Sequence, residues 1–402
     1  MTNSEVTKII DEICDISRDE NGAITRIPFT ESWMRAQMYL KEWFEKLGFE
    51  TFFDCAGNLH GRIGAAGETI MTGSHADTVR NGGKYDGLYG VVASALAASR
   101  LYQKHGMPKT AIEVIAFSEE EGSRFPMNFW GSKTLVGAID WTQAASLKDK
   151  DGISMDEALK SKGFSYTQDC AKRNDIKAFV EIHIEQGGVL EANNMEVGVV
   201  TSIVGYRKYN VEIFGQANHA GTTPMPYRKD AAFCASQIIY EIIKRAKEYG
   251  EPQVLTVGQI EFRPNLSNVV PGYVQFTVDM RNTDADTLDR LHAEVLDTIK
   301  KITAETETTF EFKEIFKDPP IPMDAGIMDI IEKACENQGV KYMKIHSGAG
   351  HDAQIMSRIA PVGMIFVPSK NGISHNPDEF TEPSQLEKGA EILEEALYKL
   401  AY

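Results

Sequence analysis

Hydrophobic residues recur at helical spacing near the N-terminus and at strand spacing directly after it. Residues 2–20 and 30–47 repeat apolar side chains every three or four positions, which predicts two packing helices. After them come short apolar runs between glycines, in FETFFD, NLHGRIG and ETIMTGSH, which are typical of strands. A helix over 88–105 and a strand over 110–117 follow. This order predicts a βαβ crossover and therefore a parallel or mixed sheet.

The middle of the chain has a different order of elements. Between residues 206 and 316 the pattern reads strand, helix, two strands, helix and strand, which is the order of ferredoxin-like domains. We expect the helices at 229–249 and 287–304, and the strands at RKYNVEIFG, VLTVGQIEF, YVQFTVDMR and TFEFKEIF. We therefore predict an α/β protein: a larger mixed-sheet domain with helices on both faces, made of residues 1–205 and 317–402, and an inserted ferredoxin-like α+β domain, 206–316.

Composition argues against nucleic acid and membrane as partners. Of the 402 residues, 42% are apolar and 25% are charged, and the formal net charge is -16. An acidic chain without a basic stripe is a poor nucleic-acid binder, because phosphate contacts need clustered positive charge. The longest run of small and apolar residues, 87–102, contains Arg100 and is too short to span a bilayer. We expect neither nucleic acid nor membrane as a partner.

Cysteine usage and the N-terminus indicate a compartment. The five cysteines are odd in number, far apart and without a CxxC pair: Cys14, Cys55, Cys170, Cys234 and Cys335. This pattern predicts free thiols in a reducing compartment. The first residues are acidic where an export signal would be basic and then apolar. We therefore expect a cytoplasmic protein.

Candidate metal ligands lie where the expected strands end. His75 and Asp77 close one strand as His-x-Asp, a spacing that lets the carboxylate accept a hydrogen bond from the ring nitrogen that does not face a metal. Asp86 follows a glycine turn and precedes a helix, so its carboxylate could bridge two cations. Taken singly, a hydrogen-bonded strand-end histidine is the favoured reading of His75, and a helix N-cap is that of Asp86.

Three successive carboxylates, Glu119 to Glu121, follow the apolar strand VIAF. Such crowding is costly unless cations or water separate the charges, and a solvated charge run is the alternative. Glu121 could bind a metal while Glu120 takes a proton from a bound water and passes it to a leaving nitrogen. His183 in VEIHIEQ and His375 in GISHNP would add imidazole ligands, although both have ordinary structural readings. Oxygen and imidazole ligands without a thiolate suit manganese, zinc or cobalt better than a closed structural zinc site.

Seven motifs together resemble one family. They are GSHADTV, GGKYDGLYGV, SEEEGSRFP, EIHIEQGGVLE, ANHAGTTPM, SGAGHDAQ and GISHNP. In this order the motifs resemble the amidohydrolase and carbamoylase branch of the dinuclear aminoacylase-type metallopeptidases, over nearly the whole chain. The chain shows no departure from that pattern at a metal or base position.

The resemblance implies two divalent metal ions per subunit, with Mn2+ favoured and Zn2+ or Co2+ also suitable. The ligands it assigns are His75 and His183 for one ion, Glu121 and His375 for the other, and Asp86 as the bridge. It further implies that the larger domain is catalytic, with Glu120 as general acid and base and Asp77 beside His75 in the catalytic group.

The resemblance also implies a homodimer formed through the inserted domain, which would act as a lid. His219 would reach the partner subunit's site and stabilise the oxyanion, and Arg281 would bind a substrate carboxylate. Further polar contacts would come from Asn268, Gln186 and the backbone of Gly350. From the residues alone, His219 could equally be an exposed loop histidine, and Arg281 could form a surface salt bridge with Asp279 or Asp284.

The implied reaction is hydrolysis of a linear ureido group on a small anionic carboxylate such as allantoate. N-carbamoyl-L-amino acids are the alternative substrates, and dipeptides are less favoured. A hypothesis of another class is a non-catalytic scaffold that kept the fold. For a scaffold we would expect a lost ligand or base, and the sequence retains the whole set.

Overall fold

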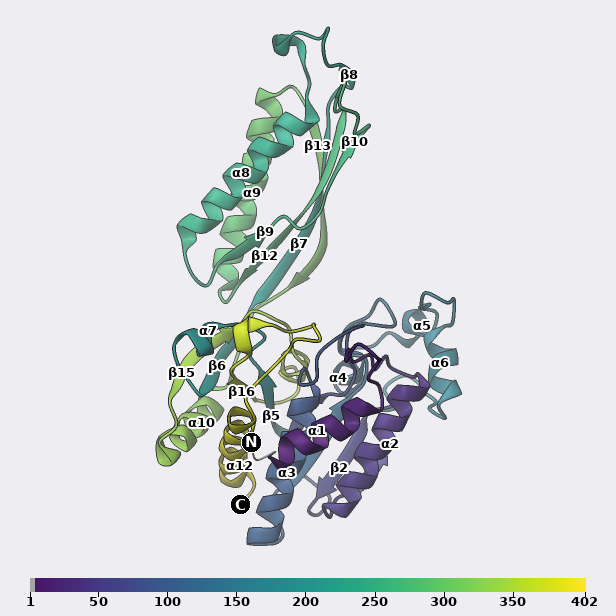
Figure 1. Cartoon of the computed structure of the whole chain (residues 1–402), viewed down its shortest axis with the longest axis vertical. Coiled ribbons are helices and arrows are strands. Elements are labelled where there is room, and N and C mark those ends of the chain that lie inside the picture. The colour runs from purple at the N-terminus through teal and green to yellow at the C-terminus, as the bar shows by residue number, and fades with distance from the viewer. Residues whose placement is uncertain (1–3) are drawn as a thin grey trace. The chain divides into compact units, whose positions relative to one another are not determined.

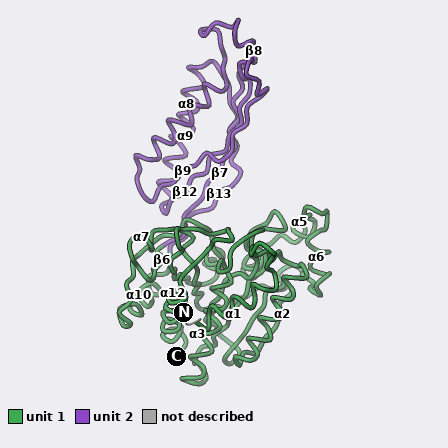
Figure 2. Tube along the Cα trace, viewed as in Figure 1, with its two compact units in different colours: residues 1–201, 323–402 green, residues 202–322 purple. Residues whose placement is uncertain are grey.

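Two compact units make up the protein in the computed structural model, which describes residues 4–402 (Figures 1 and 2). Unit 1 contains residues 1–201 and 323–402, and unit 2 contains residues 202–322. The sequence pattern had placed these borders at 205/206 and 316/317. The first two positions of the helix expected at 2–20 lie outside the described residues. No helix within residues 4–402 is long and apolar enough to cross a membrane.

Unit 1 is built around a mixed sheet in which strands β3, β4, β5 and β16 run parallel. The sheet order is β1-β2-β4-β3-β5-β16-β6-β14, and β15 also pairs with β6. The strands are β1 (Glu50–Phe53), β2 (Leu59–Ile63), β3 (Thr69–His75), β4 (Ala111–Phe117), β5 (Ile176–Ile184), β6 (Val197–Ile203), β14 (Ile321–Pro322), β15 (Tyr342–Ser347) and β16 (Val362–Val367). The predicted mixed α/β fold is confirmed.

Helices of unit 1 pack on this sheet and on one another. The longer ones are α1 (Glu5–Asp15), α2 (Glu31–Lys46), α3 (Leu88–His105), α10 (Ala325–Gln338) and α12 (Pro383–Ala401). The shorter ones are α4 (Trp130–Leu135), α5 (Trp141–Ala144), α6 (Met155–Ser161), α7 (Val189–Ala192), α11 (Asp352–Met356) and the 3-10 turn η2 (Lys370–Gly372). Serine and threonine hydroxyls cap α1 and α2: Ser4 accepts the N–H of Thr7, and Thr30 accepts that of Trp33.

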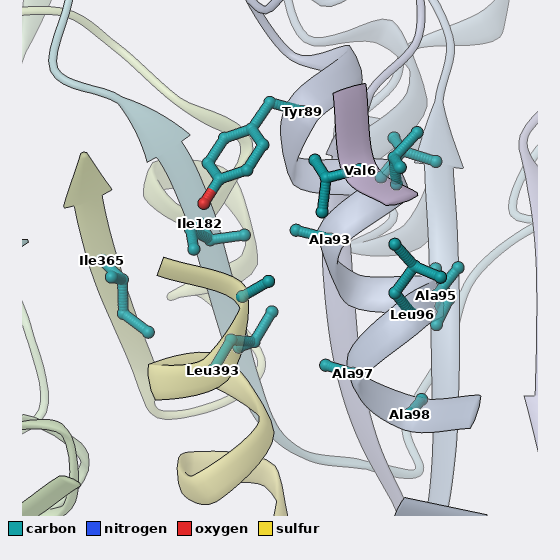
Figure 3. Packing of buried hydrophobic residues seen from close by; sticks show 14 of the residues in the cluster. Val6, Tyr89, Ala93, Ala95, Leu96, Ala97, Ala98, Ile182, Ile365 and Leu393 are labelled. Atoms are coloured by element: carbon teal, nitrogen blue, oxygen red, sulfur yellow. The ribbon is translucent and has the colours of Figure 1, made fainter. Parts of the chain in front are cut away.

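Helix α3 is buried on nearly every side because its sequence, LYGVVASALAAS, combines small and apolar residues. Figure 3 shows Tyr89, Ala93 and Ala97 of this helix near Ile182 of β5 and Leu393 of α12. The small side chains allow close approach of the neighbouring elements. Each fully buried branched or aromatic side chain contributes about 1.5–3 kcal/mol. This tight packing fixes the start of α3, where a candidate metal ligand lies.

Unit 2 places two helices, α8 (Ala231–Tyr249) and α9 (Ala285–Glu305), against a sheet of five antiparallel strands. The strands are β7 (Gly205–Phe214), β9 (Val254–Thr256), β10 (Ile260–Arg263), β12 (Tyr273–Asn282) and β13 (Thr309–Asp318). Tyr209, Val211 and Ile213 of β7 alternate with half-exposed residues and join the core beneath the helices. A two-stranded pair, β8 (Asn218–His219) with β11 (Val269–Val270), and the turn η1 (Met225–Tyr227) complete the unit.

The segment VLTVGQIEF, expected as one strand, forms two. Thr256 of β9 pairs with Asp279, whereas Ile260 of β10 pairs with Phe276. From Thr256 to Ile260 the segment advances four residues, whereas β12 advances three residues between their partners Phe276 and Asp279. The extra residue interrupts the hydrogen-bond ladder as a bulge does, and this local register change is not visible in the hydrophobic pattern.

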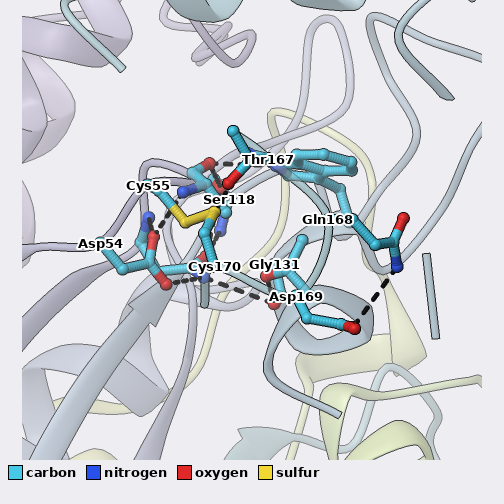
Figure 4. Close-up of a disulfide and its surroundings, with 12 residues drawn as sticks. Asp54, Cys55, Ser118, Gly131, Thr167, Gln168, Asp169 and Cys170 are labelled. Carbon is cyan, nitrogen blue, oxygen red and sulfur yellow. Dashed lines mark hydrogen bonds between the residues drawn. A yellow bond between two sulfur atoms is a disulfide. The ribbon is translucent and has the colours of Figure 1, made fainter. Parts of the chain in front are cut away.

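Two of the five cysteines, Cys55 and Cys170, form a disulfide (Figure 4). The prediction of five free thiols is therefore wrong for this pair. The bond joins the turn before β2 to the loop before β5, across a sequence separation of 115 residues. Because pairing at that distance depends on the fold, cysteine spacing could not indicate it. Cys14, Cys234 and Cys335 are buried free thiols.

Candidate metal centre

The carboxyl ends of three neighbouring parallel strands meet at one edge of the unit 1 sheet. His75 is the last residue of β3, His183 is the penultimate residue of β5, and Glu120 and Glu121 follow β4. Asp86 lies just before Gly87, the N-cap of α3. Parallel strands present the side chains at their carboxyl ends to a common crevice. The sheet topology therefore brings these ligand candidates together.

Asp86 lies at the centre of the cluster, and its two oxygens face different groups. Oδ1 lies 3.3 Å from Nε2 of His75 and 3.3 Å from Nε2 of His183. Oδ2 lies 3.3 Å from Nε2 of His375, which is 3.2 Å from Oε1 of Glu121. These are the two ligand groups that the resemblance implied, with one carboxylate shared between them.

The spacing of these atoms suits metal coordination. Two ligand atoms bound to one ion at about 2.1 Å stand about 3.0–3.4 Å apart at tetrahedral or octahedral angles. The three contacts of Asp86 and that of Glu121 fall in this range. Potential ligand atoms in each of three subsets converge within 4.8 Å of one another. The donor set therefore fits two divalent cations that share Asp86.

Backbone carbonyls orient two of the histidines. Nδ1 of His183 donates to the carbonyl of Ile184 at 2.8 Å, and Nδ1 of His75 donates to the carbonyl of Asp77 at 3.1 Å. With Nδ1 engaged by a carbonyl, each ring turns its Nε2 toward Asp86, where a metal ion can replace the Nε2 proton.

Asp77 has a different role from the one expected. Its carboxylate lies 3.8 Å from the ring of His75, beyond hydrogen-bond distance, so the expected ring contact is wrong. Instead its two oxygens accept the N–H groups of Glu120 and Glu121, each at 3.2 Å. Asp77 therefore holds the backbone of the acidic loop, because the chain turns after β4 and places those amides over the carboxylate.

The three successive glutamates divide their roles. Glu119 has a positive φ of 53° and is buried, and its Oε1 accepts the N–H groups of Arg124 and Phe125. It shapes the loop. Glu120 faces the cluster, with Oε2 3.7 Å from Nε2 of His75, and Glu121 faces His375. The run is therefore largely withdrawn from solvent.

Burial and neighbouring charge shift the titration of this cluster. Burial lowers the pKa of His75, but the carboxylates of Glu120, Asp86 and Asp77 outweigh it and raise that pKa well above its ordinary value. Burial also raises the pKa of Glu120 well above its usual range, and the charge of His75 only partly opposes this. Burial raises the pKa of Asp86 as well, but hydrogen bonds from His183, His375 and His75 overcome it and hold the pKa well below normal. Asp86 therefore stays ionised at the centre of the site.

Gln186 and Gly350, both predicted to contact substrate, lie in unit 1. Nε2 of Gln186 donates to Oδ2 of Asp86 at 2.7 Å, so this amide lies directly on the cluster. Its backbone is held at a φ of 57°, and its N–H donates to Oγ of Ser369. Gly350 lies in the loop between β15 and α11, where a Cβ would approach Phe129 to 2.9 Å.

Three predicted residues lie in unit 2. His219 and Asn268 are exposed on the β8–β11 segment. Nδ1 of His219 accepts the N–H groups of Gly221 and Thr222, so Nε2 carries the proton of the neutral ring and is a donor. Arg281 on β12 pairs with Asp279 at 3.1 Å and stacks over the ring of Tyr206. The salt bridge with Asp279 that the sequence left open is therefore present.

Sequence reasoning missed Glu379 and Ser374, two residues that adjoin the cluster. Oε1 of Glu379 accepts the N–H groups of Tyr85 and Asp86, and the hydroxyl of Ser374 lies 2.8 Å from both Glu379 and Asp86. Both residues lie within a few positions of His375. The sequence carried no signal for them beyond this proximity, because their contacts are made across the fold.

Comparison with known proteins identifies the family of the chain. The family described as peptidase family M20/M25/M40 matches residues 71–399. The chain belongs to this family. Allantoate amidohydrolase from Bacillus subtilis (strain 168) is 42% identical over 99% of this chain and 98% of its own length. Allantoate amidohydrolase from Escherichia coli (strain K12) is 42% identical over 96% of this chain and 94% of its own.

More distant relatives share the fold and nearly the full length. N-carbamoyl-L-amino-acid amidohydrolase from Pseudomonas sp. (strain NS671) is 33% identical over 97% of this chain and 96% of its own. A crystal structure of an amidase of the hydantoinase/carbamoylase family from Burkholderia multivorans superposes with a TM-score of 0.93, at 34% identity, covering 98% of this chain and 97% of the other. The chain is an amidohydrolase that acts on C–N bonds, and the His, Asp and Glu cluster is its candidate site for divalent metal.

Proposed function

We propose that this enzyme hydrolyses a linear ureido group of allantoate, giving ureidoglycine, ammonia and carbon dioxide. The observation that carries the chemistry is the shared carboxylate of Asp86, with one oxygen facing two histidines and the other facing His375. The choice of allantoate rests on the two relatives of that name, both 42% identical over almost the whole chain.

The proposed ligands are His75 and His183 on one side of Asp86 and Glu121 and His375 on the other. Two divalent ions bound there, Mn2+ in our proposal, would lower the pKa of the attacking water and polarise the ureido carbonyl. His75, Asp86 and His183 are buried, so they restrict the water on their side of the centre.

Glu120 is the proposed general acid and base. Its carboxylate is buried beside His75, with Oε2 3.7 Å from Nε2 of that ring, and it faces the cluster where the attacking water would bind. It accepts a proton from the attacking water and delivers it to the departing nitrogen, which leaves as ammonia. Asp77 holds the backbone N–H of Glu120 and so orients that side chain.

Five residues are proposed to contact the substrate. The amide of Gln186 already lies at the cluster, and Asn268 and the backbone of Gly350 supply further polar contacts. The guanidinium of Arg281 pairs with the carboxylate of Asp279 in this structure. It would pair with the substrate carboxylate instead, because a carboxylate of either kind matches the planar guanidinium. The Nε2–H of His219 would stabilise the oxyanion in the partner subunit's site of a homodimer.

A substrate comparison tests the proposal. The protein is stripped with a chelator, and ammonia release is measured from allantoate, N-carbamoyl-L-amino acids and ureidoglycolate after Mn2+, Zn2+ or Co2+ is restored. Ureidoglycolate is included because ureidoglycolate hydrolase from Oryza sativa subsp. japonica is 33% identical over 98% of this chain. We expect metal-dependent turnover with a preference for allantoate of about 100-fold or more in kcat/KM. Turnover of only another substrate would overturn the allantoate assignment, and binding without any turnover would favour a scaffold.

A variant of Glu120 and a control variant test the role of Glu120 separately from metal binding. Glu120→Gln should lower kcat by about 10²–10⁴-fold while both ions remain bound. The matched control is Asp378→Asn, which removes an exposed carboxylate close to His375. Full activity in Glu120→Gln would refute the assignment of the base.

Mixing inactive subunits tests the proposed dimer. Glu120→Gln and His219→Ala subunits are each expected to be inactive alone. If His219 acts on the partner, a mixed dimer contains one site with both native residues, and activity returns on mixing. Absence of any recovery after the subunits have exchanged would count against a role across the dimer.

A further inference from the structure

Glu379 joins the two loops that supply metal ligands on opposite sides of the candidate centre. One oxygen, Oε1, accepts the backbone N–H groups of Tyr85 at 2.7 Å and Asp86 at 3.2 Å. The other, Oε2, lies 2.8 Å from the hydroxyl of Ser374, the residue before His375. A single carboxylate thus contacts the loop that carries the shared ligand and the loop that carries the histidine opposite it.

The packing around Glu379 leaves little room for another arrangement. Its side chain is only 4% exposed, and a Cβ on Gly83 would come within 2.4 Å of it. The hydroxyl of Ser374 also lies 2.8 Å from Oδ2 of Asp86, so it stands between two carboxylates. Glu379 therefore contacts the backbone of Asp86 directly and its side chain through one hydroxyl.

Both carboxylate oxygens of Glu379 take part in these contacts. Oε1 accepts two backbone N–H groups of the Asp86 loop, and Oε2 accepts the hydroxyl of Ser374. Such outer contacts orient the side chains that bind a metal.

We propose that Glu379 is a positioning residue of the metal centre. It holds the backbone of Asp86 and the Ser374–His375 loop at the separation that lets Asp86 and His375 ligate the same ion. This inference rests on the two-metal centre of the proposed function and is independent of the substrate.

Direct measurement of metal affinity tests this role without reference to activity. Metal-free protein is titrated with Mn2+, Zn2+ or Co2+ in competition with a chromophoric chelator, and the absorption spectrum of the Co2+ form is recorded. Glu379→Gln keeps the size of the side chain but removes its charge and one acceptor. We expect it to weaken the affinity for at least one ion by about 10–100-fold and to change the Co2+ spectrum.

Two further variants complete the design. Asp378→Asn makes the same change of charge at the exposed neighbouring position and should leave affinity and spectrum unchanged. Ser374→Ala removes the hydroxyl between Glu379 and Asp86 without a change of charge, and it should weaken affinity by a smaller factor. In the double variant the two losses should be less than multiplicative, because both changes break one link. Ser374→Ala also keeps the test decisive if Glu379→Gln does not fold.

The outcomes separate this inference from the proposed function. If the native chain binds two ions and Glu379→Gln binds them with unchanged affinity and spectrum, the positioning role is wrong while the proposed function stands. A lower melting temperature of the metal-free variant with unchanged metal affinity would also overturn it, since the role would then be structural only. If the native chain binds no ion, the two-metal centre itself is wrong and this inference falls with it.

Discussion

Removal of the Cys55–Cys170 disulfide should lower the stability of unit 1 substantially. The bond closes a loop with a sequence separation of 115 residues. In the chain-entropy treatment, a cross-link over that length stabilises the folded state by about 4.8 kcal/mol, and measured values for disulfides usually fall at about 2–4 kcal/mol. We therefore expect Cys55→Ser with Cys170→Ser, or reduction of the native protein, to cost about 2–5 kcal/mol. Reductant can reach the bond because Cys170 is exposed.

The same change should spare the metal centre below the melting temperature. The turn next to Cys55 is held independently, because Asp54 accepts the backbone N–H groups of Ala56 and Asn58 and the side-chain amide of Asn58. Asn58 in turn accepts the N–H of Ser118, the residue before the acidic loop. These contacts remain when the sulfur bridge is absent. We expect metal affinity to change by less than about twofold.

Denaturant unfolding measures the effect. Native and double-variant proteins are unfolded in urea with and without a dithiol reductant, and thiols are counted after unfolding without reductant. The native protein should show three thiols and lose stability on reduction, whereas the double variant should already be less stable and be insensitive to reductant. Five thiols in the native protein, or an unfolding midpoint that reduction does not move, would refute the reasoning.

Three other predictions follow from contacts within unit 1. In Gly87→Ala the new Cβ would lie 2.4 Å from the ring of His75, so metal affinity should fall at least about tenfold by chelator competition. Glu113 is buried and lies 2.8 Å from Nδ1 of His60 and 2.8 Å from the guanidinium of Arg62, so Glu113→Gln should cost about 3–5 kcal/mol in denaturant unfolding. Asp86 and Glu121 raise the pKa of His375 to about 11 in the metal-free protein. Metal must displace that proton, so the affinity for the ion that His375 binds should rise about tenfold per pH unit below 11, as followed by proton release.

Each of these three predictions has a control measurement and a result that would refute it. Gly106→Ala introduces the same unfavourable positive φ into open space, so equal metal affinity in the two alanine variants would refute the clash. Glu68→Gln removes an exposed carboxylate and should leave stability nearly unchanged, and an equally small loss in Glu113→Gln would contradict a stabilising role of the buried contacts of Glu113. The pKa of His375 is higher in the metal-free fold than in the unfolded chain, so its protonation stabilises that fold. This stabilisation is complete below about pH 6.5 and is lost as the pH rises through about 11. Metal affinity that stays flat between pH 6 and 9 would contradict the proton competition.

The sequence by itself determined the local structure and the set of chemical groups. Helical and strand spacing are short-range properties, so α3, α8 and α9 lie close to their predicted ranges. The order of the elements predicted a mixed sheet, which the structure confirms. Because carboxyl ends of parallel strands meet, His75, the acidic loop and His183 could also be expected at one edge.

The tertiary structure alone decided how distant groups pair. Asp77 binds the amides of the acidic loop instead of the ring of His75, because those amides pass over its carboxylate. Cys55 and Cys170 meet across 115 residues, and Glu379 reaches back to the loop of Asp86. None of these contacts leaves a periodic trace in the sequence. They arise because packing places segments side by side that are far apart along the chain, and the free energy of such contacts depends on the whole fold.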